Sequence, residues 1–358
     1  MNNKPSNGKQ RASRQRDGAV TMDDLAKETG LSKMTISRVF MESSNVRPST
    51  REKVLQVARR LGYEYNALAG NFASGRAKLV GVAVDVENLM GSFYFARLFK
   101  GVHAVLEDAG YRSVIFDTGS EEFSSGAGLD RLVSQRRVDG LLAFVPPQNQ
   151  TDFLAGFSRQ HTSIVLIGGR IPERKVPWVD LDNHHAIEQL LRHLHKLGHR
   201  KIGLVAGPGS ITDAIERAKA FHVLRKKLRL RWNKDWQQNG EFSYGPGREA
   251  AQRILASSDR PTAILAGNDA SALGACEAVR GLGLTPGREV SVAGVDGWEP
   301  AAQADPPITT VIQPLEEMGR RAASMLLGTI KHRSQKLGNA VFQGSLLVRG
   351  STGSVQAD

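Results

Sequence analysis

The 358-residue chain has a single cysteine, Cys276, and no long apolar run. One cysteine cannot form an internal disulfide, which fits a reducing compartment and excludes a disulfide scaffold. No run approaches the ~20 apolar residues that a membrane-spanning helix needs. The basic N-terminus also lacks the apolar stretch of a secretory signal. These absences predict a cytoplasmic protein with no membrane partner.

Acidic residues are too few to balance the basic ones, and the formal net charge is +12. Residues 1–78 hold 15 Lys/Arg and 7 Asp/Glu, whereas the other 280 residues hold 33 and 29. Hydrophobic residues make up 40% of the chain, which excludes wholesale disorder. A compact basic segment beside a nearly neutral body predicts an N-terminal nucleic-acid-binding end, with a solvated surface as the alternative.

Residues 19–65 have the pattern of three short helices. Thr21, with an Asp three residues later, has the spacing of a capping box, and Gly30 would end this first helix. Ser32 is expected to cap a second helix over 33–40. Two short helices joined by a turn that contains glycine are typical of a helix-turn-helix.

A second capping box is expected at Ser49-x-x-Glu52, before a third helix that Gly62 would stop.

Residues 1–18 are polar and basic, and we predict a disordered tail there. Residues 66–78 contain a short helical pattern with poor interior residues, so we predict a hinge that orders only when something holds it.

Residues 79–358 alternate between apolar runs of strand length and helical stretches, which predicts parallel sheets covered by helices. The length favours two sheets, with a ligand bound between two lobes. The expected strands are Leu79–Val84, Ser113–Phe116, Gly140–Phe144, Ile164–Ile167, Val176–Leu181, Ile202–Val205, Ala263–Ala266 and Val290–Val295. The expected helices are Phe93–Ala109, Leu129–Arg136, His185–Leu197, Thr212–Leu228, Gly247–Ala256, Ser271–Leu282 and Pro314–Lys331.

Nine short stretches of sequence, distributed over residues 21–352, resemble motifs of one protein family and follow one another in the same order as in that family. They are Met22–Val39, Arg47–Val54, Leu61–Tyr63, Leu197–Gly203, Arg260–Ile264, Asn268–Gly274, Val290–Gly294, Pro306–Val311 and Val348–Thr352. Each resembles a landmark of the lactose/galactose repressor family of bacterial transcription regulators. The resemblance implies a small all-α helix-turn-helix headpiece joined to an α/β, two-lobed sensor with parallel sheets, similar to periplasmic binding proteins.

The resemblance also implies a function. The chain is expected to be a homodimeric repressor that binds a palindromic operator and controls carbohydrate or sugar-acid use, with its DNA affinity set by a small-molecule effector. The alternative from another class is a sugar-binding receptor without a regulatory role. That receptor would need export, and residues 1–20 contain no export signal. A C-terminal heptad for tetramer assembly is absent after Arg349.

Positions that match the family's DNA contacts lie in the second helix and the hinge. In the major groove and on phosphates they are Thr21, Ser32, Lys33, Met34, Thr35, Ser37, Arg38 and Asn45; in the minor groove they are Asn66, Ala69 and Phe72. Lysine and arginine suit guanine acceptors, and Met34 suits a thymine methyl group. Phe72 stands where the family usually has a leucine wedge; packing against the sensor is its alternative role. Ile36 and Val39 are expected in the core.

Positions that match the family's effector contacts are Tyr94, Phe95, Arg170, Arg217, Phe242, Asn268 and Asp296. Each has a structural alternative: Asp296 could cap a turn, and Tyr94 could be core. The family usually has an aspartate after the strand that ends at Ile167, whereas this chain has Gly168, Gly169 and Arg170. A cation in place of an acid favours an anionic effector, a sugar acid or sugar phosphate, unless Arg170 points to solvent.

No cofactor, metal or catalytic residue is expected. The histidines between His184 and His199 lack the spacing of metal ligands. Gly207-Pro-Gly-Ser lacks the ending of a phosphate-binding loop, and no Gly-x-Ser-x-Gly elbow is present. Cys276 lies in an apolar helix and is expected in the core. The chain is therefore predicted not to be an enzyme.

Overall fold

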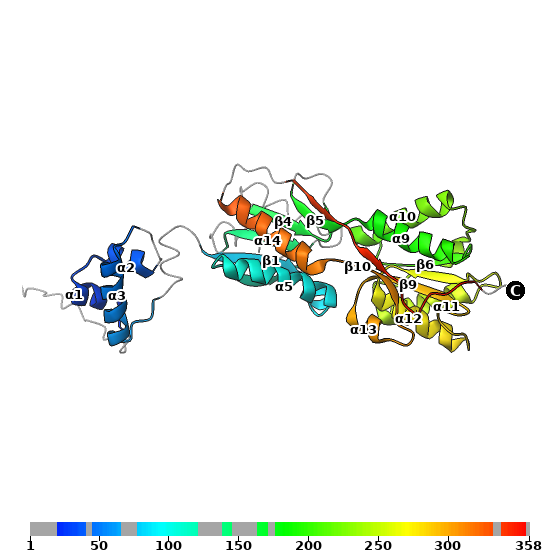
Figure 1. The fold of residues 1–358 in the computed structure, drawn as a ribbon, viewed down its shortest axis with the longest axis horizontal. Helices are drawn as coiled ribbons and strands as arrows, with labels where there is room; N and C mark the ends of the chain where they lie inside the picture. The colour runs from blue at the N-terminus through cyan, green and yellow to red at the C-terminus, as the bar shows by residue number, and fades with distance from the viewer. Residues whose placement is uncertain are drawn as a thin grey trace, which may run out of the picture. The chain divides into compact units, whose positions relative to one another are not determined.

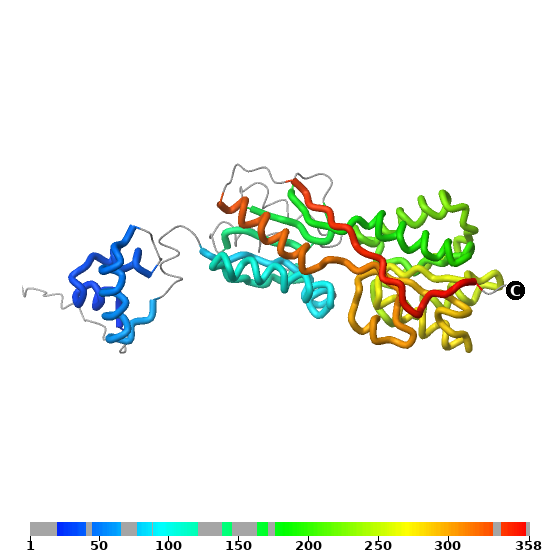
Figure 2. Tube along the Cα trace, viewed as in Figure 1, coloured from blue at the N-terminus to red at the C-terminus, as the bar shows by residue number. Residues whose placement is uncertain are grey.

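The computed structural model describes residues 20–40, 45–65, 77–120, 138–144, 163–170, 176–331 and 338–355. The chain divides into two compact units, Met1–Ala77 and Lys78–Asp358, and each is considered by itself (Figures 1 and 2). The expected tail over 1–18, the helix expected at 129–136 and the hinge residues Asn66, Ala69 and Phe72 lie outside the described residues.

The described residues of the N-terminal unit form the helices α1 (Met22–Thr29), α2 (Lys33–Phe40) and α3 (Pro48–Leu61). Thr21 caps α1 through the expected capping box with Asp24, and Gly30 ends the helix in the left-handed conformation. The amide of Thr35 donates to the hydroxyl of Ser32 at 3.2 Å, as expected for a cap of α2. The buried core is formed by Leu25, Ile36, Val39, Val54 and Ala58.

The expected capping box at Ser49 and Glu52 is wrong. Helix α3 begins at Pro48, and its N-cap is Arg47, two residues before Ser49. Arg47 makes no side-chain cap hydrogen bond. Proline fixes φ at a helical value and has no amide hydrogen to satisfy, so it starts the helix without a cap. The expected end at Gly62 is confirmed, because Gly62 adopts the left-handed conformation.

The N-lobe of the second unit is a six-stranded sheet in the order β11-β5-β4-β3-β1-β2, with every neighbouring pair parallel. Its strands are β1 (Leu79–Val84), β2 (Arg112–Asp117), β3 (Gly140–Phe144), β4 (Ser163–Ile167), β5 (Trp178–Leu181) and β11 (Ala340–Phe342). Its described helices are η1 (Val86–Met90), α5 (Phe93–Asp108) and α14 (Leu315–Lys331). The apolar faces of α5 and α14 share one core with the sheet.

The C-lobe is a second six-stranded sheet, in the order β12-β10-β9-β8-β6-β7, in which only β12 is antiparallel to its neighbour. The strands are β6 (Ile202–Ala206), β7 (Gln237–Asn239), β8 (Ala263–Ala266), β9 (Ser291–Asp296), β10 (Thr309–Ile312) and β12 (Ser345–Leu347). The helices are α9 (Asn183–Lys196), α10 (Thr212–Lys227), η3 (Lys234–Trp236), α11 (Tyr244–Leu255), α12 (Asp269–Gly281) and α13 (Glu299–Gln303).

Alternate residues of the C-lobe strands enter two different cores. Leu265 packs in the core that α9 and α10 cover, whereas Ile264 and Ala266 pack in the core of α11 and α12. A period of two places successive side chains on opposite faces, so a strand buried on both sides is apolar throughout. Cys276 lies in the second of these cores, as expected.

The chain passes between the lobes three times, from β5 to α9, from β10 to α14 and from β11 to β12. The crossings are side by side. The amide of Asp182 donates to the carbonyl of Phe342 at 2.7 Å, and a Cβ built on Gly344 would lie 2.5 Å from Val311. Gln189 donates to the carbonyl of Gly344 at 3.0 Å. These contacts join the three crossings into one connection (Figure 2).

The eight expected strands are all present, with ends that shift by one or two residues. Four strands were not expected: β7, β10, β11 and β12. Three of them, β7, β11 and β12, are only three residues long, and β7 is entirely polar (Gln-Gln-Asn). Short strands at a sheet edge have little apolar signal, because only one neighbour and few side chains stabilise them.

Two glycines allow α5 and α14 to approach closely. A Cβ built on Gly319 would lie 2.0 Å from the carbonyl oxygen of Leu98, and one built on Gly101 would lie 2.0 Å from that of Glu316. Neither position can hold a larger side chain unless the two helices separate. The N-lobe core therefore depends on these two residues.

We expect Gly319→Ala to lower the free energy of unfolding by about 1–3 kcal/mol, because the added methyl group meets rigid backbone. Gly281→Ala is the matched control, since a Cβ there has no atom within 4 Å. Thermal unfolding of both variants measures the difference. Equal stability of Gly319→Ala and Gly281→Ala would contradict the close approach of α5 and α14.

Candidate functional site

Helix α2 presents a polar and exposed face. The exposed residues are Ser32, Lys33, Met34 and Arg38. Met34 has 66% of its surface exposed, although it is a large hydrophobic residue. Ile36 and Val39 are buried on the opposite face, which confirms the expectation for both. An α-helix fits the major groove of DNA, and the exposed face of α2 carries side chains of the kinds that contact base edges.

Two of the predicted DNA contacts, Thr21 and Lys33, also bond to neighbouring side chains. Thr21 is exposed, but its hydroxyl group already bonds the carboxylate of Asp24 at 2.7 Å. Lys33 forms an ion pair with Asp23 at 2.6 Å. Thr35 and Ser37 are half-buried, and Asn45 is exposed.

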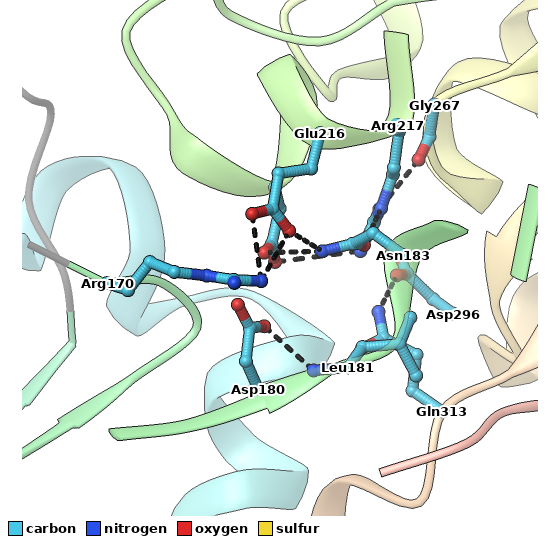
Figure 3. Close-up of polar contacts among 10 residues, drawn as sticks. Arg170, Asp180, Leu181, Asn183, Glu216, Arg217, Gly267, Asp296 and Gln313 are labelled. Atoms are coloured by element: carbon cyan, nitrogen blue, oxygen red, sulfur yellow. Dashed lines mark hydrogen bonds and ion pairs between the residues drawn. The ribbon is translucent and has the colours of Figure 1, made fainter. Parts of the chain in front are cut away.

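A second group of polar side chains lies where the N-lobe and the C-lobe meet (Figure 3). We call it the interlobe cluster. Its members are Tyr94, Arg170, Asp180, Asn183, Asp213, Glu216, Arg217 and Asp296. Tyr94 comes from α5, Arg170 follows β4 and Asp180 is in β5, so the N-lobe supplies these three. Helices α9 and α10 and the end of β9 supply the others.

Arg217 is the centre of the C-lobe part. Its guanidinium donates to the amide oxygen of Asn183 at 2.8 Å and to the carbonyl of Gly267 at 2.7 Å. It also lies 3.6 Å from the carboxylate of Asp213, one turn earlier on α10. The side chain is only 4% exposed, so these bonds replace its hydration. Its guanidinium lies 5.5 Å from the ring centre of Phe242.

Phe242 is held in a backbone conformation that favours glycine, with φ of +52°. A Cβ built on Gly207 or on Gly267 would lie 2.3 Å or 2.9 Å from its ring, so two glycines make room for the ring. Residues in such conformations tend to cluster at functional sites. Asn268 is next to this ring, but both ends of its amide are occupied: it donates to the carbonyl of Phe242 and caps α12 at Ser271.

Arg170 connects the two lobes. Its guanidinium forms an ion pair with Glu216 of α10, with N···O distances of 2.8 and 3.0 Å. The same group lies 4.5 Å from the ring centre of Trp178, within reach of a cation–π interaction. Asn183 donates to Glu216 at 3.2 Å from the other side. Arg170 therefore does not simply point to solvent.

The absence of an aspartate before Arg170 has a physical reason. A Cβ on Gly168 would lie 2.4 Å from the hydroxyl oxygen of Tyr94, and Gly168 has φ of +73°. The tyrosine hydroxyl thus takes the place that a side chain at 168 would need. Among the described residues this buried hydroxyl has no hydrogen-bond partner, and the same is true of Oδ2 of Asp180 and Nε of Arg170.

Burial among other carboxyl groups changes the protonation of the cluster. Burial and the neighbouring Asp213 raise the pKa of Asp180 to about 9, so its carboxyl is protonated at neutral pH. Burial raises the pKa of Asp296 to about 7, and the negative charge of Asp269 adds to the effect. Burial likewise raises the pKa of Tyr94 well above its ordinary value. Asp296 accepts a hydrogen bond from Gln313 at 2.7 Å.

The structure brings most of the expected effector residues together, but not all of them. Tyr94, Arg170, Arg217, Phe242 and Asp296 belong to the cluster or contact it. The structure does not place Phe95 there. Its ring is 4% exposed in the N-lobe core and packs on Phe99 and Phe144. Neighbouring residues on a helix point about 100° apart, so Tyr94 and Phe95 cannot both face the same site.

Sequence reasoning missed four members, Asp180, Asn183, Asp213 and Glu216. The sequence does contain a signal for Asp213, because its separation of four residues from Arg217 places both side chains on one face of a helix, where they can pair. Asp180 is the last residue but one of β5 and so lies at the carboxyl end of a strand, where ligand sites of parallel sheets lie. Their presence also removes the reason to expect an anionic effector, because both arginines are already paired with carboxylates.

Two family models match stretches of this chain, one in each unit. Residues 21–66 match the model of bacterial regulatory proteins of the lacI family, and residues 191–352 match a periplasmic binding protein-like domain. The HTH-type transcriptional regulator CelR of Thermobifida fusca is 30% identical over 339 residues, 92% of this chain and 98% of the relative. The chain belongs to the lacI family of bacterial regulatory proteins. It is therefore a DNA-binding transcription regulator and resembles regulators rather than enzymes.

Solved structures of this family have the same architecture. The lac repressor dimer bound to operator and the anti-inducer ONPF covers 94% of this chain, with a TM-score of 0.83 and 26% identity. The complex of the regulator CelR with cellobiose covers 93%, with a TM-score of 0.70 and 27% identity. They confirm the expected helix-turn-helix headpiece and two-lobed sensor. No described helix of this lacI-family chain is long and apolar enough to cross a membrane.

The protonation of Asp180 predicts how stability depends on pH. Its pKa of about 9 in the folded state lies above the ordinary 3.8, so folding binds a proton. The free energy of unfolding should fall as pH rises from about 4 to about 9, by up to ~1.4 kcal/mol per pH unit from this group. Asp180→Asn, which keeps a neutral hydrogen-bonding group, should lack this contribution.

Denaturant unfolding at about pH 5 and about pH 8 measures the effect. The stability of Asp180→Asn relative to the wild type should increase between the two pH values. Asp259→Asn is the control, because Lys201 holds the pKa of that exposed carboxyl below its ordinary value. Parallel profiles for the wild type and Asp180→Asn would show that Asp180 is ionised in the folded protein.

Proposed function

We propose that the chain is a homodimeric repressor that acts in the bacterial cytoplasm, binds a palindromic operator and responds to a carbohydrate bound at the interlobe cluster. The observation that carries the proposal is a set of three polar atoms, one each of Tyr94, Arg170 and Asp180. They are buried where two lobes meet and have no hydrogen-bond partner within the part of the chain that the structure describes. Buried polar groups are almost always hydrogen-bonded, so a site that leaves three of them unsatisfied is suited to a polar ligand.

The chemistry of the cluster favours a ligand rich in hydroxyl groups. Carboxyl and amide groups accept and donate hydrogen bonds, and the rings of Trp178 and Phe242 offer apolar faces beside them. A sugar has hydroxyl groups at its rim and apolar faces. An acidic sugar fits less well, because the guanidinium groups of Arg170 and Arg217 are already paired with Glu216 and Asp213. The related CelR, whose complex contains cellobiose, supports a carbohydrate.

We propose that α2 reads the operator, with Arg38, Lys33 and Met34 directed at base edges. Arg38 and Met34 are exposed on the face opposite the core, and arginine pairs with guanine acceptors. The lac repressor dimer bound to operator supports a dimer on two half-sites.

We further propose that 66–78 forms the hinge and that Asn66, Ala69 and Phe72 contact the minor groove. Effector binding would change lobe closure and thereby the hinge.

The DNA proposal is tested by selecting binding sequences from a random duplex library with the wild-type protein. The selected sites should be near-palindromic, and the affinity should fall steeply with salt. Arg38→Ala should weaken binding to the selected operator about 5- to 150-fold, the equivalent of ~1–3 kcal/mol. Arg60→Ala, which loses only an exposed ion pair with Glu28, is the control. Equal affinity of both variants would contradict base reading by Arg38.

The effector proposal is tested by thermal shift with neutral sugars, amino sugars, sugar acids and sugar phosphates. A ligand at ~100 times its Kd adds about 2.7 kcal/mol of stability, which is a shift of several degrees. Sugars without negative charge should stabilise the protein, and Asp213→Asn should lose the response. Stabilisation by sugar acids or phosphates alone would contradict this assignment.

A further inference from the structure

The ion pair between Arg170 and Glu216 differs from the others in the sensor. Arg170 belongs to the N-lobe and Glu216 to the C-lobe, whereas every other ion pair among the described sensor residues joins groups of one lobe. This ion pair therefore joins the lobes at the position where an effector would have to bind.

The guanidinium of Arg170 is bound as a cationic ligand would be. The ring of Trp178 lies on one side, 4.5 Å away, and the carboxylate of Glu216 binds at 2.8 and 3.0 Å. An aromatic face and a carboxylate are the groups by which proteins recognise amines and guanidines. The fit is incomplete, since Nε of Arg170 is buried and has no partner among the described residues.

The carboxylates of the cluster are matched by its two guanidinium groups. Glu216 faces Arg170 and Asp213 faces Arg217, while burial keeps Asp180 protonated at neutral pH. A cationic group that takes the place of Arg170 therefore keeps this balance of charge. The two arginines are not held equally. Arg217 is 4% exposed and bonded within the C-lobe, whereas Arg170 is 39% exposed and held from the opposite lobe. Arg170 is thus the cation that can leave.

We propose that Trp178 and Glu216 form a cation subsite between the lobes, which the chain's own Arg170 fills when no effector is bound, and that the effector places a protonated amine or guanidine there. The inference rests on the proposed function only in taking the interlobe cluster as the effector site. It narrows the ligand from carbohydrates in general to those with a basic nitrogen, such as amino sugars.

The subsite also gives the sensor a regulatory device. With Arg170 in place, the lobes are joined without a ligand, so the unliganded sensor already populates a closed arrangement. An effector that takes over Trp178 and Glu216 releases Arg170 and replaces one connection between the lobes by another. A ligand shifts a conformational equilibrium only by its difference in affinity for the two states, and this exchange supplies such a difference.

Chemical rescue tests the subsite without knowledge of the effector. The full chain carrying Arg170→Ala is titrated with millimolar methylguanidinium at constant ionic strength, and thermal unfolding is followed. Methylguanidinium should raise the Tm of this variant saturably, by about 2–4 °C. It should not stabilise the wild type, whose own side chain fills the site. Urea, which is similar in shape but neutral, should have no such effect.

Two further variants make the test specific. The double variant Arg170→Ala/Glu216→Gln should not be rescued, because the carboxylate that binds the cation is gone. Arg192→Ala is the matched control: Arg192 forms an ion pair with Glu188 within α9, inside one lobe, and its loss should create no site for methylguanidinium. Rescue of Arg192→Ala, or of the double variant, to the same extent would overturn the proposal, and so would the absence of rescue in Arg170→Ala.

Operator binding separates this inference from the proposed function. If Arg170→Ala binds the selected operator but methylguanidinium does not stabilise it, the cation subsite is wrong and the regulator stands. If the wild type selects no operator, the proposed function is wrong, and rescue still decides the subsite. Should Arg170→Ala not fold, Arg170→Gln, whose side chain is shorter than that of arginine and carries no charge, takes its place in the same titration.

Discussion

The three adjacent chain crossings between the lobes are the constraint on which the sensor depends. They fix the ends of β5, β10 and β11 beside one another, through the bond between Asp182 and Phe342 and the close approach of Gly344 to Val311. A single crossing would leave the lobes free to rotate about many axes. Three parallel crossings leave mainly a hinge opening, so a small change at the interlobe cluster becomes a defined movement.

The interlobe cluster lies between the two lobes, where an opening of the hinge changes the distances between its polar groups. Asp180 lies in β5, one residue before the end of that strand. Asn183, Asp213 and Arg217 form the facing wall from α9 and α10. Groups from both lobes meet there only when the lobes are together. Any ligand that bonds to both walls therefore favours the closed arrangement, which is how such a sensor converts binding into a change of shape.

Local signals predicted much of this fold. Apolar runs located eight of the strands, and Thr21, Ser32 and Gly62 marked helix ends, because caps and hydrophobic periodicity act within a few residues of sequence. The wrong prediction of a capping box at Ser49 also has a local cause. Two local rules competed there, and the fixed φ of Pro48 prevailed over the side-chain cap. Strands such as β7 lack a local signal and form only because a neighbouring strand is present.

The polar cluster could not be predicted in the same way, since its partners are distant in sequence. Arg170 and Glu216 are 46 residues apart, and Arg217 and Gly267 are 50 apart. Read alone, Arg170 suggested an anionic ligand; beside Glu216 and Trp178 it indicates the reverse. The charge of one residue predicts a ligand only when the charges around it are known, and these depend on the tertiary fold.

Such a cluster is a poor source of stability. Moving several charges out of water costs more free energy than their attraction returns unless each is fully bonded, and well-packed apolar residues would often stabilise the fold as well or better. Here Asp180 stays protonated and three polar atoms lack partners among the described residues. Unsatisfied bonding in a place where the lobes meet is what a binding site needs before its ligand arrives. The cluster is therefore better explained by the recognition of an effector than by the stability of the sensor.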